Sequence, residues 1–123
     1  MLTIYTLANC DTCRRAVKWL RAKNVAFAEK PIRETPPNRA ELRAVLAARG
    51  GDLRKLFNTA GNEYRALNLA EKLPTLTGAE ALALLAGNGS LVKRPFLVGT
   101  NSAGEAVGLV GFEEAAWAGG LGK

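Results

Sequence analysis

The hydrophobic spacing changes twice near the start of the chain. Residues 2–7 alternate apolar and polar side chains and are rich in strand formers, which predicts a β-strand. Residues 12–23 then have the spacing of an amphipathic helix, which Asn9 or Asp11 is placed to cap. The apolar face of that helix consists of Cys13, Ala16, Val17 and Leu20. Residues 25–32 return to strand character, so the pattern predicts a β-α-β unit.

The middle of the chain has helical spacing and no convincing strand. A helix is expected to begin at Asn38, a favoured N-cap residue, and to stop at Gly50 and Gly51. Residues 52–86 contain several short helical segments, of which the last begins at Thr77. This part of the chain therefore predicts a helical insertion rather than a continuation of the sheet.

Strand character returns toward the carboxyl end. Residues 96–100 and 105–110 are predicted to pair as a hairpin, and a short helix is predicted to follow them. The order β-α-β, helices, β-β-α predicts an α/β fold with a mixed four-stranded sheet flanked by helices. The length fits a single domain, residues 1–123. We expect its core at about residues 1–33 and 91–119 and the helical insertion at about residues 38–88.

The amino-acid composition limits which kinds of partner the chain is expected to bind. Lys and Arg number 17 against 11 Asp and Glu, a formal net charge of +6, but the basic residues form no block and are not interleaved with aromatic residues. We therefore expect no direct nucleic-acid binding. No apolar run is long enough to span a membrane, and the first residues are strand-like rather than leader-like. We accordingly expect no membrane association and a cytoplasmic location.

The chain has no histidine, which limits its chemistry further. Cys–His dyads, Ser–His–Asp triads and histidine-ligated metals are all excluded. With only two cysteines, a zinc site within one chain would need two carboxylates as well. We expect no metal site and no bound cofactor.

The two cysteines are the leading candidates for chemistry. Cys10 and Cys13 form a C-x-x-C motif where the predicted strand meets the predicted helix, so unpaired helix N–H groups and the helix dipole favour a thiolate at Cys10. Cys10 is then the nucleophile, and Cys13, one turn further in, the resolving thiol. A C-x-x-C beside a β-α-β pattern is typical of a thioredoxin-like redox motif. Two alternatives remain: buried packing residues, or half of a zinc site shared between chains.

Other residues are candidates for binding an anionic substrate near Cys10. Arg94 precedes Pro95 at the entry to the third predicted strand, where a cis X-Pro bond would turn the arginine away from its own strand. Its guanidinium could then hold an anion in a bidentate contact, with a solvated surface arginine as the alternative. The remaining candidates for anion or substrate binding are Asn9, Thr12, Arg14, Asn58, Arg65 and Pro95.

Four segments in this order and spacing resemble the ArsC/Spx family. They are TIYTLANCDTCRRAVKWL, LFNTAGNEYRALNL, LVKRPFLV and VGFEEAAW, which together extend over nearly the whole chain. The resemblance implies a thioredoxin-like fold with an inserted helical subdomain. In the family's arsenate reductases a cysteine, here Cys10, attacks arsenate held by three arginines. Only Arg94 matches one of these, because the other two positions are Asn58 and Gly111, so efficient arsenate reduction is not expected.

The Spx branch of the family implies a different role. There the cysteine pair is a disulfide switch, and the protein binds the RNA polymerase alpha subunit through a glycine near which Gly51 falls. Compact arsenate-reductase-like members of the family imply glutathione-dependent thiol reduction instead. We expect a thiol–disulfide redox protein with glutathione as co-substrate and glutaredoxin or a disulfide substrate as partner. An Spx-like regulator is the alternative, and an arsenate reductase is a weaker one.

Overall fold

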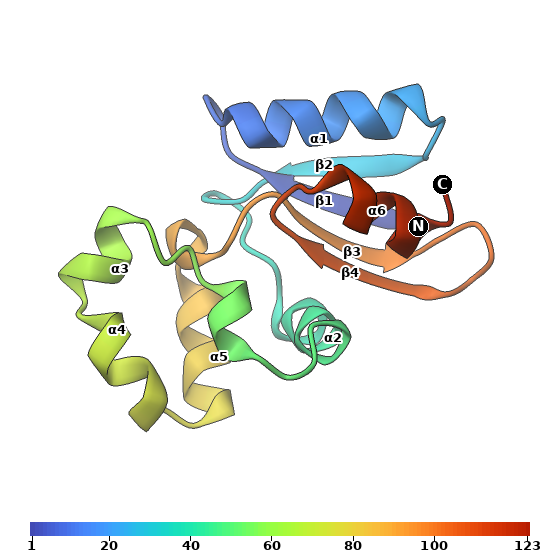
Figure 1. Cartoon of the computed structure of the whole chain (residues 1–123). Coiled ribbons are helices and arrows are strands. Elements are labelled where there is room, and N and C mark those ends of the chain that lie inside the picture. The colour runs from blue at the N-terminus through green and yellow to red at the C-terminus, as the bar shows by residue number, and fades with distance from the viewer.

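The computed structural model describes all residues, 1–123, and contains one mixed four-stranded sheet (Figure 1). The strands are β1 (Leu2–Thr6), β2 (Phe27–Pro31), β3 (Phe96–Thr100) and β4 (Ala106–Val110), in the order β2-β1-β3-β4. β1 is parallel to β2 and antiparallel to β3, which pairs with β4 as a hairpin. The predicted strands and the mixed sheet are confirmed.

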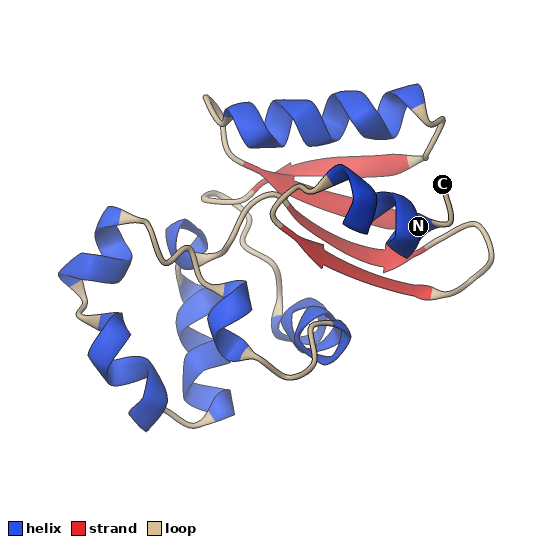
Figure 2. Ribbon diagram, in the orientation of Figure 1, coloured by secondary structure: helices blue, strands red, loops and turns tan.

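Helices cover both faces of this sheet (Figure 2). α1 (Asp11–Ala22) and α6 (Glu114–Leu121) lie on one face. The other side carries α2 (Arg39–Ala48), α3 (Asn62–Ala66), α4 (Leu69–Lys72) and α5 (Gly78–Gly87), with short 3₁₀ helices η1 (Leu53–Leu56), η2 (Leu73–Thr75) and η3 (Gly89–Leu91). None of these helices is long and apolar enough to cross a membrane.

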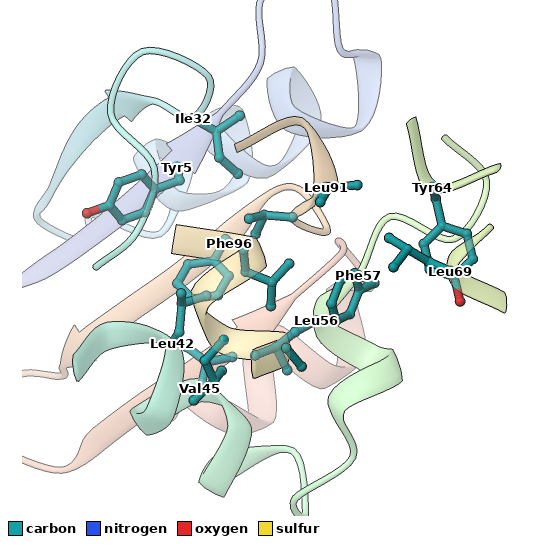
Figure 3. Packing of buried hydrophobic residues seen from close by; sticks show 14 of the residues in the cluster. Tyr5, Ile32, Leu42, Val45, Leu56, Phe57, Tyr64, Leu69, Leu91 and Phe96 are labelled. Carbon is teal, nitrogen blue, oxygen red and sulfur yellow. The ribbon is translucent and has the colours of Figure 1, made fainter. Parts of the chain in front are cut away.

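The alternation of side chains along the strands divides the buried residues into two clusters. On β1, Ile4 points into a cluster of 11 buried residues with α1 and α6, which we call the α1 core. The next residue, Tyr5, points into a cluster of 16 buried residues with α2 and the helices that follow it, the α2 core (Figure 3). α2 approaches the sheet closely at Gly108, where a Cβ atom would lie 2.9 Å from the Cα of Val45.

Capping residues explain where two of the long helices begin. Asn38 Oδ1 accepts from the Glu41 N–H at 2.8 Å, and the Glu41 carboxylate accepts from the Asn38 N–H at 3.0 Å. Thr77 and Glu80 form the same reciprocal capping box before α5. The predicted helix start at Asn38 is confirmed.

The predicted cap of α1 was wrong. The N-cap is Cys10, whose backbone is extended and whose sulfur accepts the N–H of Cys13. Asn9 has a φ of 62°, so it turns the chain before the helix and does not cap it. Asp11 is already the first helical residue, and its carboxylate faces Arg15.

Candidate functional site

The end of β1 delivers Cys10 to the amino terminus of α1. Its Sγ accepts the Cys13 N–H at 3.2 Å, and its carbonyl oxygen accepts the Arg14 N–H at 3.0 Å. The residue is half-buried and its thiol is free. The sulfur thus accepts an N–H that has no partner within the helix, and it lies at the positive end of the helix dipole. Both stabilise negative charge on the sulfur.

Cys13 lies in a different environment, although only one helical turn separates it from Cys10. It is 2% exposed and also a free thiol. Burial, and secondly hydrogen bonding to Cys10, raises the pKa of Cys13 to about 12, although Leu7 and the charge of Arg94 oppose the rise. Cys13 is therefore a protonated thiol at neutral pH, next to a more accessible sulfur.

Arg94 lies at the same end of the sheet as Cys10, because β3 begins where β1 ends. We call this end of the sheet, where β1 stops and β3 starts, the edge. Its Nη1 donates to the carbonyl oxygens of Ser90 at 3.0 Å and Val92 at 3.3 Å, and the Arg94–Pro95 bond is cis. No other hydrogen bond or ion pair engages the guanidinium. Its Nε and Nη2 hydrogens remain able to donate to an anion.

Two hollows adjoin this edge, and the first turn of α1 contributes to both. The smaller, of about 380 Å³, is lined by Thr12, Arg15, Lys93, Arg94, Val110, Gly111, Phe112 and Glu113. The larger, of about 800 Å³, is lined by residues 6–9, Cys13, Arg14, Val17, Lys18, Arg21, Glu29 and Pro31. Each contains three cationic side chains and one carboxylate.

Few of these cations are neutralised within the chain. The structure has two ion pairs, and both belong to Asp11, with Arg14 at 3.9 Å and Arg15 at 3.4 Å. Lys93, Arg94, Lys18 and Arg21 have no carboxylate within 4.0 Å. The surroundings of the cysteine pair are therefore basic and suited to an anionic ligand.

The structure brings most of the predicted site residues to this edge. Asn9 and Arg14 line the larger hollow, and Thr12 and Arg94 line the smaller one. Pro95 is buried beside them, and its carbonyl oxygen accepts the Gly111 N–H at 2.9 Å. Asn9 and Arg14 thus share a hollow with Cys13, whereas Thr12 and Arg94 line a hollow that neither cysteine lines.

Three predicted residues lie elsewhere. Asn58 is tied by its N–H to the Leu91 carbonyl at 2.7 Å, and Arg65 on α3 is exposed and donates to Asn62. Neither lines the two hollows. Gly51 follows α2, is exposed with a φ of 78°, and lines a separate hollow of about 730 Å³.

Three cations that line the two hollows were not predicted from the sequence as site residues. Lys18 and Arg21 follow Arg14 at intervals of four and three residues, a spacing that puts all three on one helix face and could have been recognised. Lys93 gave no such signal, because its place depends on the loop before β3. No group of three or more cysteine or carboxylate side chains is close enough to hold a metal ion.

Comparisons with known proteins agree with the fold. Among solved structures, one from Streptococcus mutans UA159, described as a possible arsenate reductase, is 41% identical with a TM-score of 0.80 and covers 92% of each chain. The solution structure of SACOL0876 from Staphylococcus aureus COL is 35% identical, with a TM-score of 0.80 over 98% of each chain. The fold is thus an ArsC-like α/β fold with a cysteine pair at the start of its first helix.

Sequence comparisons define the family. The model of the ArsC family matches residues 5–119. The uncharacterized protein YusI of Bacillus subtilis is 46% identical over 113 residues, or 92% of each chain. The global transcriptional regulator Spx of Enterococcus faecalis is 32% identical over 80% of this chain and 73% of Spx. The chain belongs to the ArsC family.

Proposed function

We propose that this protein is a thiol–disulfide oxidoreductase in which Cys10 is the nucleophile. The observation that carries the proposal is the asymmetry of the pair. Cys10 is half-buried and accepts a helix N–H, whereas Cys13 is buried and its pKa is raised to about 12. The Cys10 sulfur is thus placed to act as a nucleophile, and Cys13 stays a protonated thiol until Cys10 has reacted.

The reaction proceeds by two thiol exchanges. The Cys10 thiolate attacks one sulfur of a disulfide RS–SR′, so that a Cys10–SR bond forms, the RS–SR′ bond breaks, and R′S⁻ leaves with the electron pair. Cys13 then gives its proton to the departing thiolate or to water, and its sulfur attacks Cys10 Sγ, which releases RS⁻. Two molecules of glutathione reduce the resulting Cys10–Cys13 disulfide and become glutathione disulfide. Alternatively, a glutathione thiolate attacks Cys10 Sγ and RS⁻ leaves, after which a second glutathione attacks the glutathione sulfur of this mixed disulfide, so that the Cys10 thiolate leaves and glutathione disulfide forms.

The basic edge supports an anionic co-substrate such as glutathione. Arg94 presents free guanidinium hydrogens near the cysteine pair, and its charge already acts on Cys13. As positioned, it stabilises a thiolate or a bound carboxylate.

The test is glutathione-dependent reduction of bis(2-hydroxyethyl) disulfide by the wild-type protein and two matched variants. Cys10→Ser should lower the rate roughly a hundredfold or more, because a serine hydroxyl is not a nucleophile toward disulfides at neutral pH. Cys13→Ser decides the resolving thiol: retained activity assigns that step to glutathione, and lost activity assigns it to Cys13. Full activity of Cys10→Ser would overturn the proposal.

A redox-switched regulator is the second candidate, supported by the similarity to Spx and by the exposed Gly51. In that case the cysteine pair toggles a disulfide without turnover, and the protein binds the RNA polymerase alpha subunit. Pull-down of that subunit under oxidising and reducing conditions separates the candidates, because only the regulator should bind in a redox-dependent way. Arsenate reduction, with glutaredoxin as partner, is the weaker candidate and is tested by turnover of arsenate.

A further inference from the structure

Gly111 leaves room that another side chain occupies. It follows β4, has a φ of 65°, and donates its N–H to the Pro95 carbonyl at 2.9 Å. A Cβ atom at this position would lie 3.2 Å from Cε of Lys93, and no other atom would be within 4 Å. The Lys93 side chain therefore lies over Gly111, in the space that a side chain at position 111 would need.

Lys93 brings an unpaired charge to the smaller hollow. The residue is exposed and has no carboxylate within 4.0 Å. Arg94, its neighbour, contributes free guanidinium hydrogens to the same hollow. The third cation, Arg15, forms an ion pair with Asp11. Glu113 is the one carboxylate in the lining and pairs with none of the three cations. The hollow thus has a positive charge that the chain does not neutralise.

The hollow and the cysteine pair meet the same first turn of α1, although neither cysteine lines the hollow. Thr12, in its lining, lies between the two cysteines in the first turn of α1. The charge of Arg94 acts on Cys13 as well as on the hollow. An anionic group bound there would lie against the first turn of α1, which begins at Cys10.

We propose that Lys93 and Arg94 form a carboxylate-binding subsite, for which Gly111 makes room, and that it selects thiol or disulfide substrates carrying a carboxylate. Arg94 supplies directional donors, and Lys93 supplies a mobile point charge. The occupant fitting this chemistry is a glutathionyl group, which combines carboxylates with a sulfur. This inference rests on the proposed function for its substrate class, but the binding it requires is measurable without turnover.

The binding test uses S-methylglutathione, which has the carboxylates and cannot react with Cys10. Titration of the wild type, followed by NMR chemical shifts, should move the signals of residues lining the smaller hollow. Lys93→Gln should weaken the affinity about three- to tenfold, the range for losing one partly exposed charged contact, and Lys93→Arg should restore it. Lys55→Gln, which removes an exposed lysine on η1, should change nothing. Equal affinities of wild type and Lys93→Gln would overturn the subsite.

The kinetic test compares two disulfides with dithiothreitol, a neutral reductant. Lys93→Gln should raise the KM for anionic glutathione disulfide by the same three- to tenfold at unchanged kcat, and leave bis(2-hydroxyethyl) disulfide unaffected. Higher salt should reduce the preference of the wild type for glutathione disulfide. Equal losses with both disulfides would overturn the subsite. Failure to reduce either would contradict the proposed function, while the S-methylglutathione titration still decides the subsite.

Discussion

The edge of the sheet that carries the cysteines and the helical layer from α2 to α5 are built in opposite ways. At the edge, the free thiol of Cys10 occupies a helix cap position, and each of the two hollows there is lined by three cationic side chains. The helical layer has two complete capping boxes and contributes most of the 16-residue α2 core (Figure 3). The difference shows that the helical layer is stabilised by reciprocal caps and buried apolar packing, whereas the edge carries the free sulfur and the charged hollows on which the proposed reactivity depends.

The comparison first predicts a large loss of stability in the helical layer. Leu85 on α5 is completely buried, so Leu85→Ala should lower the free energy of unfolding by about 2–5 kcal/mol through lost burial and a cavity. Leu67→Ala is the matched control, because Leu67 is 41% exposed and should cost less than about 0.5 kcal/mol. Urea unfolding, monitored by tryptophan fluorescence, measures both. Equal losses of unfolding free energy in the two variants would show that the α2 core does not contribute the stability assigned to it.

The second prediction concerns alkylation of the two thiols. In the reduced wild type at pH 8, iodoacetamide should modify Cys13 at least about a hundredfold more slowly than Cys10, because burial limits access and a pKa of about 12 leaves little thiolate. Since the pKa of Cys13 is raised, the rate at Cys13 should climb as the pH approaches 12. Both cysteines lie in one tryptic peptide, residues 1–14, so fragment mass spectra must assign the label. Comparable rates at pH 8 would remove the asymmetry on which the proposed function depends.

The parts of the fold and of the site that could be predicted from the sequence are those with local signals. The strands and long helices were predicted because periodicity and the caps at Asn38 and Thr77 are local signals. The cysteine turn was found because C-x-x-C and its β-α-β setting are also local. The position of Lys93 over Gly111 was not predictable, because it depends on β3 and β4 pairing across the sheet. Cys10 as the cap was missed because cysteine is not among the favoured N-cap residues.

The smallest predicted effect separates reactivity from stability at Cys10 itself. Its sulfur caps α1 by accepting the Cys13 N–H, and a serine oxygen is a favoured acceptor in that position. Cys10→Ser should therefore leave the free energy of unfolding unchanged or raise it by up to about 1 kcal/mol, while Cys10→Ala should be about 1 kcal/mol less stable than Cys10→Ser. Urea unfolding under reducing conditions measures both variants.

Asn38→Ala provides the reference for a cap in the helical layer, where we expect a loss of about 1 kcal/mol. If Cys10→Ser instead proves as unstable as Cys10→Ala, the sulfur contributes to the fold beyond capping, and the contrast between the two regions fails at its central residue. If Cys10→Ser is as stable as the wild type but inactive, the scaffold accepts serine and only the chemistry needs cysteine. That outcome would locate the requirement for Cys10 in its reactivity.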